Sequence, residues 1–184
     1  MRFNVTPATL IPRPETSELV EWIANESNGT VRILDIGTGS GCIAVGLAHK
    51  LQQSRVRAWD ISPDALAVAA ENSKANNCAV TFEQVDILEY HPNSEQFDII
   101  VSNPPYIPYK DSRVDAGAIH DPHIALYAAN NGLAAYQSIA KNAKHWIKPD
   151  GKLFLEIGID QGTDIKTIFI SNGWDLLRSE PDLA

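Results

Sequence analysis

The chain has 184 residues, of which 44% are hydrophobic and 21% are charged. These values are typical of one globular domain that buries its own core. The formal net charge is −8 and the sequence contains no basic run, which disfavours a nucleic-acid partner. No apolar run approaches the roughly 18 residues of a membrane span, and residues 1–20 are too polar for a signal peptide. We therefore expect a cytoplasmic protein that contacts no membrane. As to partners of its own kind, we expect a monomer.

Hydrophobic periodicity predicts elements that alternate between helices and strands. Proline in the first turn supports the first helix, and a Ser-Pro pair begins the third. In chain order we expect a helix over 14–26, a strand over 31–35, a helix over 42–51, a strand over 55–60, a helix over 62–76, strands over 80–85 and 97–102, a long loop over 107–125, a helix over 133–147, a turn at 149–151, a strand over 152–157, a helix over 164–171 and a strand over 174–179. This alternation predicts an α/β fold with a doubly wound, mostly parallel sheet.

Chemically useful residues gather where the predicted strands end. Asp35, Gly37, Asp60, Asp86 and Asn103 lie at or just after strand ends. In doubly wound sheets, ligands bind beyond the carboxyl ends of the strands, at the point where the strand order reverses. We therefore expect these five residues along one edge of the sheet.

A glycine-rich segment, residues 35–41, follows the first predicted strand with the sequence Asp-Ile-Gly-Thr-Gly-Ser-Gly. Glycine is needed where the backbone turns sharply and a ligand approaches closely. The dinucleotide fingerprint would require Gly or Ala at position 42, where this chain has Cys42. The segment instead resembles motif I of the class I methyltransferases, which bind S-adenosylmethionine in a Rossmann-like fold. The alternative is an ordinary strand–helix turn. The cofactor contacts expected here are Asp35, Gly37, Thr38, Gly39, Ser40 and Gly41.

Two further acids follow the second and third predicted strands. Asp60 is placed to accept the two hydroxyls of a ribose, although it could instead cap the following helix. By the same resemblance, Asp86 accepts the adenine amino group and Ile87 backs the ring. The alternative for Asp86 is a solvated loop acid.

The tetrapeptide Asn103-Pro104-Pro105-Tyr106 follows the strand over 97–102. Both residues that precede a proline are pushed to extended conformations, and neither proline has an N–H. The Asn103 side-chain oxygen and the Pro104 carbonyl can therefore accept both N–H bonds of a planar –NH2 group, and Tyr106 can stack on its flat face. We expect these four residues to form the catalytic site and Asn103 also to contact the cofactor. The alternative is a rigid turn.

Several segments together resemble the HemK family of protein-(glutamine-N5) methyltransferases. The resemblance covers nearly the whole chain and is carried by residues 10–16, 35–41, 103–106, 121–126 and 155–158, with Gln161. It implies methylation of the glutamine in the Gly-Gly-Gln motif of peptide-chain release factors. S-adenosyl-L-methionine would be the cofactor, S-adenosyl-L-homocysteine its product, and release factors the partners.

The chain also departs from this family. Family members usually begin with a helical domain that helps to hold the release factor, whereas Phe3 already lies near the start of the catalytic domain. The family normally continues beyond Ala184 into a final antiparallel strand, and Asp121 stands where a Glu is usual. We therefore expect residues 1–184 to form a single methyltransferase domain without the helical substrate domain and without the last strand.

Two rival functions and two uncertain residue roles stay open at this point. The first rival is an amino methyltransferase for adenine or guanine in a nucleic acid, which would need a groove for a flipped base. The second is a truncated cofactor-binding module without turnover. His120 and His123 could suggest a metal pair, but a third ligand is not evident and we expect no metal. Arg13 could contact the cofactor or the substrate, or pair with a surface acid.

Overall fold

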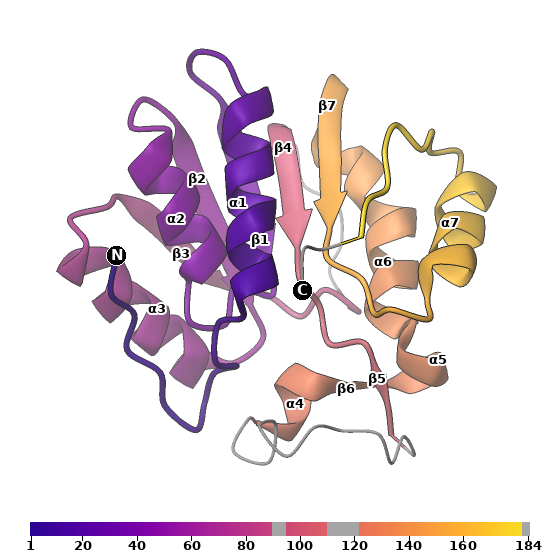
Figure 1. Cartoon of the computed structure of the whole chain (residues 1–184), viewed down its shortest axis with the longest axis horizontal. Coiled ribbons are helices and arrows are strands. Elements are labelled where there is room, and N and C mark those ends of the chain that lie inside the picture. Colours follow the sequence, from indigo (N-terminus) through magenta and orange to yellow (C-terminus); the bar gives the residue numbers. More distant parts are fainter. Residues whose placement is uncertain (90–94, 110–121, 182–184) are drawn as a thin grey trace.

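A parallel β-sheet forms the centre of the computed structural model, which describes residues 1–89, 95–109 and 122–181 (Figure 1). Its strand order is β3-β2-β1-β4-β7, and every neighbouring pair is parallel. The strands are β1 (Arg32–Ile36), β2 (Arg55–Asp60), β3 (Val80–Gln84), β4 (Phe97–Ser102) and β7 (Ile147–Leu155). The chain passes from β1 outward to β3 and then returns to the other side of β1. The predicted α/β, doubly wound fold is therefore confirmed, with its switch point between β1 and β4.

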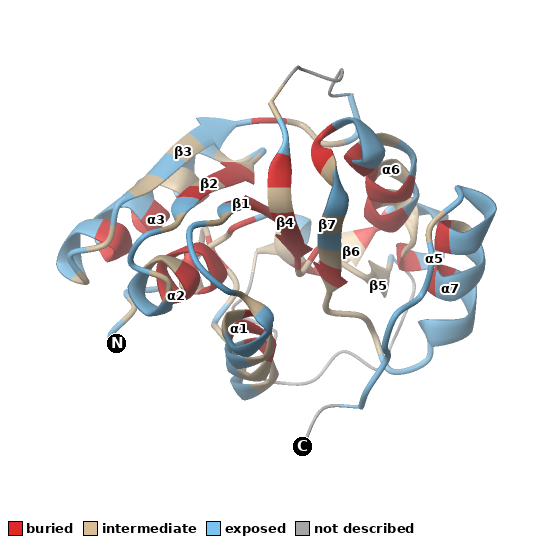
Figure 2. Cartoon of the chain, turned by 90° about the horizontal axis from the view of Figure 1, so that it is seen from above, coloured by how far each residue is buried: buried red, intermediate tan, exposed pale blue. Residues whose placement is uncertain are grey.

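Helices cover both faces of the sheet (Figure 2). One face carries α1 (Pro14–Glu26), α2 (Cys42–Lys50) and α3 (Pro63–Ala75), and the other carries α6 (Ala134–Asn142) and α7 (Gly162–Ser171). The predicted cap of α3 is present, because the Ser62 hydroxyl oxygen accepts the Ala65 N–H at 3.1 Å. Among the described residues, no helix combines the length and the apolar character that crossing a bilayer requires.

Alternate residues of each strand enter different cores. On β1, Ile33 packs with α1 and α2, whereas Leu34 packs with α6, and both are fully buried. The core under α6 is aromatic: Trp59 and Trp146 meet edge to face, with ring centroids 5.2 Å apart. Burial on both faces explains the apolar runs in the central strands, Ile33-Leu34 in β1 and residues 99–101 in β4.

The long loop predicted over 107–125 contains regular structure at both ends. The short strands β5 (Ile107–Pro108) and β6 (Tyr127–Ala128) pair in parallel, and the one-turn helices α4 (His123–Leu126) and α5 (Ala129–Gly132) flank β6. The loop prediction is therefore wrong at those ends, and its centre, 110–121, lies outside the described residues. This second sheet lies beside the carboxyl end of β4 (Figure 1).

Three predictions near the C-terminus are wrong. Helix α6 ends at Asn142 and a short 3-10 turn (Ala143–His145) follows, where a helix to 147 was expected. The predicted turn at 149–151 belongs to β7, whose irregular register between Ile147 and Lys152 absorbs the extra residues. The segment predicted as a strand over 174–179 forms no strand. Instead, the Trp174 indole N–H donates to the Ala140 carbonyl oxygen at 2.8 Å and holds this segment against α6.

Candidate functional site

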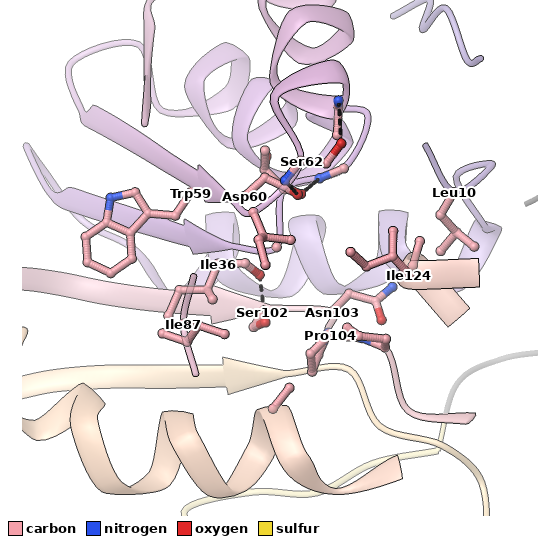
Figure 3. Close-up of a pocket in the computed structure, with 18 of the residues that line it drawn as sticks. Leu10, Ile36, Trp59, Asp60, Ser62, Ile87, Ser102, Asn103, Pro104 and Ile124 are labelled. Atoms are coloured by element: carbon pink, nitrogen blue, oxygen red, sulfur yellow. Dashed lines mark hydrogen bonds between the residues drawn. The ribbon is translucent and has the colours of Figure 1, made fainter. Parts of the chain in front are cut away.

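A cavity of about 310 Å³ opens at the carboxyl ends of β1 and β4, at the switch point of the sheet. Its walls come from the loops after β1, β2, β3 and β4 and from residues 8–12 before α1. The strand β6, the short helices α4 and α5 beside it, and α6 complete the lining. Figure 3 shows Asp60 and Ser62 on one side of this space, Asn103 and Pro104 on another, and Ile36 between them. The predicted gathering of strand-end residues along one edge is therefore confirmed for Gly37, Asp60, Asp86 and Asn103.

The glycine-rich loop turns sharply beneath the cavity. The Gly37 and Thr38 N–H groups both donate to the Trp59 carbonyl oxygen, at 2.8 and 3.0 Å, which ties the loop to β2. Gly37 and Gly39 have φ values of 72° and 54°, in the left-handed region that favours glycine. A Cβ added to either residue would meet no protein atom within 4 Å, so these glycines leave free space. Thr38 and Ser40 line the cavity as well.

Two members of the predicted cofactor set lie behind the loop instead of in the cavity lining. Asp35 is fully buried, and its carboxylate accepts the Thr38 hydroxyl at 2.6 Å and the Ala44 N–H at 3.2 Å. Burial raises the pKa of the Asp35 carboxyl to about 7. Gly41 faces α3, where an added Cβ would lie 3.0 Å from the Ala69 Cβ. Both residues therefore shape the loop, and their contact with a cofactor stays a prediction.

Asp60, the last residue of β2, and Asp86, which follows β3, do line the cavity. The Asp60 carboxylate accepts the Gly39 N–H and the Ser62 N–H, each at 2.9 Å, and burial raises the pKa of this carboxyl above its usual value. Asp86 accepts the Leu88 N–H at 2.9 Å, and the neighbouring Ile87 packs against the aromatic core. A carboxylate offers about four lone-pair directions, so both acids keep capacity for a ligand.

The tetrapeptide divides between the cavity and the core. Asn103, Pro104 and Pro105 line the cavity, whereas Tyr106 is absent from its lining and lies against Gly158. The Gln161 amide N–H donates to the Tyr106 carbonyl oxygen at 2.9 Å and fixes this position. The structure therefore brings three of the four predicted catalytic residues to the cavity, and the stacking role of Tyr106 stays a prediction.

Two polar residues that the sequence motifs did not predict form hydrogen bonds beside Asn103, and one of them, Thr16, also lines the cavity. The Asn103 side-chain nitrogen (Nδ2) donates to the Thr16 hydroxyl at 3.5 Å, and that hydroxyl donates to the Glu156 carboxylate at 2.9 Å. Thr16 lies in the first turn of α1 and is 4% exposed. Both residues occur in segments that carry the family resemblance, but their separation of 140 residues concealed the contact.

The sequence patterns also did not predict the aromatic side chains at the cavity mouth. The rings of Tyr109, His123 and Tyr127 stack on one another, with centroids 4.2 to 6.2 Å apart, and both tyrosines line the cavity. His123 is therefore a stacking residue; His120 lies outside the described residues. No group of three or more potential metal ligands occurs in 1–89, 95–109 and 122–181.

The remaining cavity chemistry argues against a covalent nucleophile. Cys42 lines the cavity at the start of α2. Burial raises the pKa of its thiol to about 12, and Asp35 adds to the effect. A thiol that stays protonated at neutral pH is a poor nucleophile. The site offers hydrogen-bond acceptors and shape, which suit a transfer that needs positioning more than proton abstraction.

Comparison with known proteins agrees with this geometry. The Methyltransferase small domain family matches residues 15–121. A release factor glutamine methyltransferase of Lactococcus lactis is 46% identical, and the match covers 97% of this chain and 67% of that protein. The corresponding Streptococcus pneumoniae protein is 45% identical, with 92% and 61% covered. A Pyrococcus furiosus methyltransferase structure, 20% identical, superposes with a TM-score of 0.71 over 94% of this chain and 78% of that one, which supports the fold alone.

The chain spans about three fifths to two thirds of the length of these curated relatives. The match nevertheless runs through the glycine-rich loop, the acids after β2 and β3, and the tetrapeptide after β4. The chain therefore belongs to the release factor glutamine methyltransferase family.

Proposed function

We propose that this chain binds S-adenosyl-L-methionine in the cavity and transfers its methyl group to a glutamine side-chain nitrogen of peptide-chain release factors. The observation that carries the proposal is the shared cavity: the glycine-rich loop and the acids after β2 and β3 line it together with Asn103 and Pro104. A cofactor and an amide held there would meet at the carboxyl ends of β1 and β4. Family membership supports the same chemistry.

The residues present suit the cofactor. The free space at Gly37 and Gly39 would admit it against the backbone, where any side chain would take up room. The N-terminus of α2 favours an anionic group such as the cofactor carboxylate. Asp60 would accept the ribose hydroxyls, Asp86 the adenine amino group, and Ile87 would cover the ring face. S-adenosyl-L-homocysteine would remain in the cavity as product.

Methyl transfer here needs orientation more than acid–base chemistry. The cofactor supplies an electrophilic methyl group on a positively charged sulfur. The Asn103 side-chain oxygen and the Pro104 carbonyl accept the two N–H bonds of the amide, which raises the electron density on its nitrogen and holds it in line with the methyl–sulfur bond. With the cofactor bound, the amide nitrogen would take the methyl group as the carbon–sulfur bond breaks, and the proton that the nitrogen loses would pass to the Asn103 or Pro104 oxygen or to water. The apolar walls favour the loss of charge at sulfur.

The protein substrate is inferred from the relatives, whose names specify release factors. The net charge of −8 agrees with a protein substrate better than with a nucleic acid. The aromatic stack at the cavity mouth offers a flat apolar surface for a loop of such a substrate. Release factors act at the ribosome, so the proposal includes a cytoplasmic enzyme, which we expect to act as a monomer.

A labelled methyl-transfer assay tests this function. The full-length protein is incubated with methyl-labelled cofactor and a purified bacterial release factor, and with a matched factor whose Gly-Gly-Gln glutamine is replaced by alanine. We expect label in the first factor and none in the second. Equal labelling of both factors, or no labelling of either by a protein that binds S-adenosyl-L-homocysteine, would contradict the proposal.

A further inference from the structure

The orientation of the Asn103 amide decides whether the proposed acceptor exists. An Asn side chain has a carbonyl oxygen on one side and an NH2 group, which is only a donor, on the other. Turned by 180°, the amide would present its own N–H bonds to the N–H bonds of the substrate. The two groups would then repel each other instead of forming a hydrogen bond, so an acceptor role needs a device that fixes the orientation.

The hydrogen bonds from the Asn103 NH2 group to Thr16, and from Thr16 to Glu156, can fix this orientation. Glu156, when ionised, only accepts hydrogen bonds, so the Thr16 hydroxyl directs its single proton to the Glu156 carboxylate across 2.9 Å. The oxygen of Thr16 then has only lone pairs left for its other neighbour. The Asn103 side chain consequently turns its NH2 group to Thr16, where the nitrogen lies 3.5 Å from the hydroxyl oxygen.

Both ends of this chain of contacts are held in place. Thr16 is almost fully buried in the first turn of α1, which begins with Pro14. The Glu156 N–H donates to the Ser102 carbonyl oxygen at 3.0 Å, and the Glu156 carbonyl oxygen accepts the Tyr136 hydroxyl at 2.8 Å. The backbone of Glu156 is therefore anchored beside the last residue of β4, next to Asn103.

We propose that Thr16 and Glu156 are positioning residues that set the Asn103 amide with its oxygen toward the cavity. Thr16 also lines the cavity, but in this proposal both residues act through Asn103. The proposal rests on the proposed function for its catalytic consequence, but the orientation itself is a property of the folded chain. It also gives α1 a part in the site, because this helix carries Thr16, whose hydroxyl sets the donor and acceptor order of these hydrogen bonds.

Substitutions at Thr16 separate the hydroxyl from the shape of the side chain. Thr16→Val keeps the shape and removes the hydroxyl, whereas Thr16→Ser keeps the hydroxyl. Thr167→Val is the matched control, because it removes an exposed hydroxyl on α7 that only bonds to the Thr163 carbonyl of its own helix. Each variant is made in the full-length protein, and thermal unfolding and affinity for S-adenosyl-L-homocysteine are measured to show that fold and cofactor binding persist.

The first readout does not depend on turnover. The side-chain amide resonance of Asn103, assigned by its loss in Asn103→Asp, is followed by NMR in each variant. We expect Thr16→Val to shift this resonance and to accelerate its hydrogen exchange with water, and Thr16→Ser and Thr167→Val to leave it in place. An Asn103 resonance that is unchanged in Thr16→Val would overturn the proposal, even if the wild-type protein methylates no release factor.

The second readout is methyl transfer to release factor. We expect Thr16→Val to lower kcat by roughly 10- to 100-fold, the effect of losing one oriented group at a reacting centre, with little change in cofactor affinity. Thr16→Ser should restore most of the rate. Glu156→Met should lower kcat as well, and adding it to Thr16→Val should cause little further loss, because two links of one relay are not additive. If the losses of kcat in Thr16→Val and Glu156→Met added fully in the double variant, the two residues would act independently, which would contradict the proposal.

Discussion

The two sides of the cavity are built over very different distances along the chain. On the cofactor side, Asp35 bonds to Thr38 and Ala44, 3 and 9 residues away, and Gly39 bonds to Asp60, 21 residues away. On the acceptor side, Asn103 bonds to Thr16 across 87 residues, and Thr16 bonds to Glu156 across 140. One side is a nearly continuous strand–loop–helix unit, whereas the other exists only after distant segments have met.

Because of this difference, cofactor binding and the positioning of the substrate amide should depend on different parts of the fold. The cofactor side would form with the β1–α2–β2 unit, because short chain closures cost little entropy. The acceptor side depends on the docking of α1 and on the pairing of β4 with β7, whose register places Ser102 beside Leu155. A change on the cofactor side should therefore weaken cofactor affinity, and a change on the acceptor side should slow transfer with the cofactor still bound.

The largest effect is expected at Asn103. Asn103→Ala removes one of the two acceptors for the substrate N–H bonds, so methyl transfer should fall by roughly 100- to 1000-fold, as when a reacting centre loses one oriented partner. Binding of S-adenosyl-L-homocysteine, measured by calorimetry, should change far less. Asn25→Ala on the exposed face of α1 is the control and should match the wild type. A variant with intact turnover would sink the acceptor mechanism.

Gly39→Ala should show the opposite pattern. An alanine here would have to adopt the φ of 54° that Gly39 has, which costs roughly 1 to 2 kcal/mol. Its methyl group would project into free space. We expect cofactor affinity to fall by at least about tenfold, with the transfer rate at saturating cofactor much less affected. Gly162→Ala is the matched control, since its Cβ would meet only the Ile157 Cδ1 at 3.8 Å. Unchanged affinity in Gly39→Ala would mean that the cofactor binds elsewhere.

A smaller effect on the acceptor side is expected at Gln161. Its amide N–H groups donate to the carbonyl oxygens of Tyr106 and Asn131, which fixes the chain after the tetrapeptide. Losing such contacts costs about 1 kcal/mol, so Gln161→Ala should lower kcat/KM for release factor by about fivefold to tenfold. Cofactor affinity should not move. Steady-state kinetics of this variant beside Gln53→Ala, an exposed substitution, would distinguish positioning of Tyr106 from general destabilisation.

The last prediction concerns stability instead of activity: the pH dependence of unfolding should change at Asp35. Burial raises the pKa of its carboxyl from 3.8 to about 7. Between these values the folded chain holds a proton that the unfolded chain has lost, so this group makes the free energy of unfolding decrease as the pH rises. Asp35→Asn cannot ionise and should therefore lose less stability over the same range, by about 1 kcal/mol or more.

Urea denaturation near pH 5 and near pH 8 measures this difference. The exposed substitution Asp175→Asn should reproduce the pH dependence of the wild type. Parallel profiles for Asp35→Asn and the wild type would show that the buried carboxyl stays ionised throughout the range.

The sequence predicted the cofactor side better than the acceptor side for the same physical reason. Strand ends and the glycine-rich loop follow from local periodicity and turn chemistry, so Asp60, Asp86 and Asn103 were placed correctly at one edge. The orientation of a side chain is set by tertiary packing. Asp35 turns beneath the loop to meet Ala44, and Tyr106 turns toward Gly158, although both belong to recognisable motifs.

Contacts between distant segments left no local pattern to detect. Thr16 lies in α1 and Glu156 directly follows β7, so the hydrogen bonds from Asn103 through Thr16 to Glu156 form only when α1 and β7 are both in place. The failed strand prediction over 174–179 has a similar origin, since a tertiary hydrogen bond from Trp174 to Ala140 holds that segment against α6. Apolar periodicity alone does not distinguish a strand that pairs in a sheet from an irregular segment that packs against a helix.

A crystal structure of the full-length protein with S-adenosyl-L-homocysteine and a release factor tests the central claim most directly. We predict that the side-chain nitrogen of the substrate glutamine lies within hydrogen-bond distance of both the Asn103 side-chain oxygen and the Pro104 carbonyl oxygen, with the Asn103 NH2 group turned to Thr16. A glutamine nitrogen bound away from Asn103, or an Asn103 amide whose NH2 group faces that nitrogen, would contradict the account.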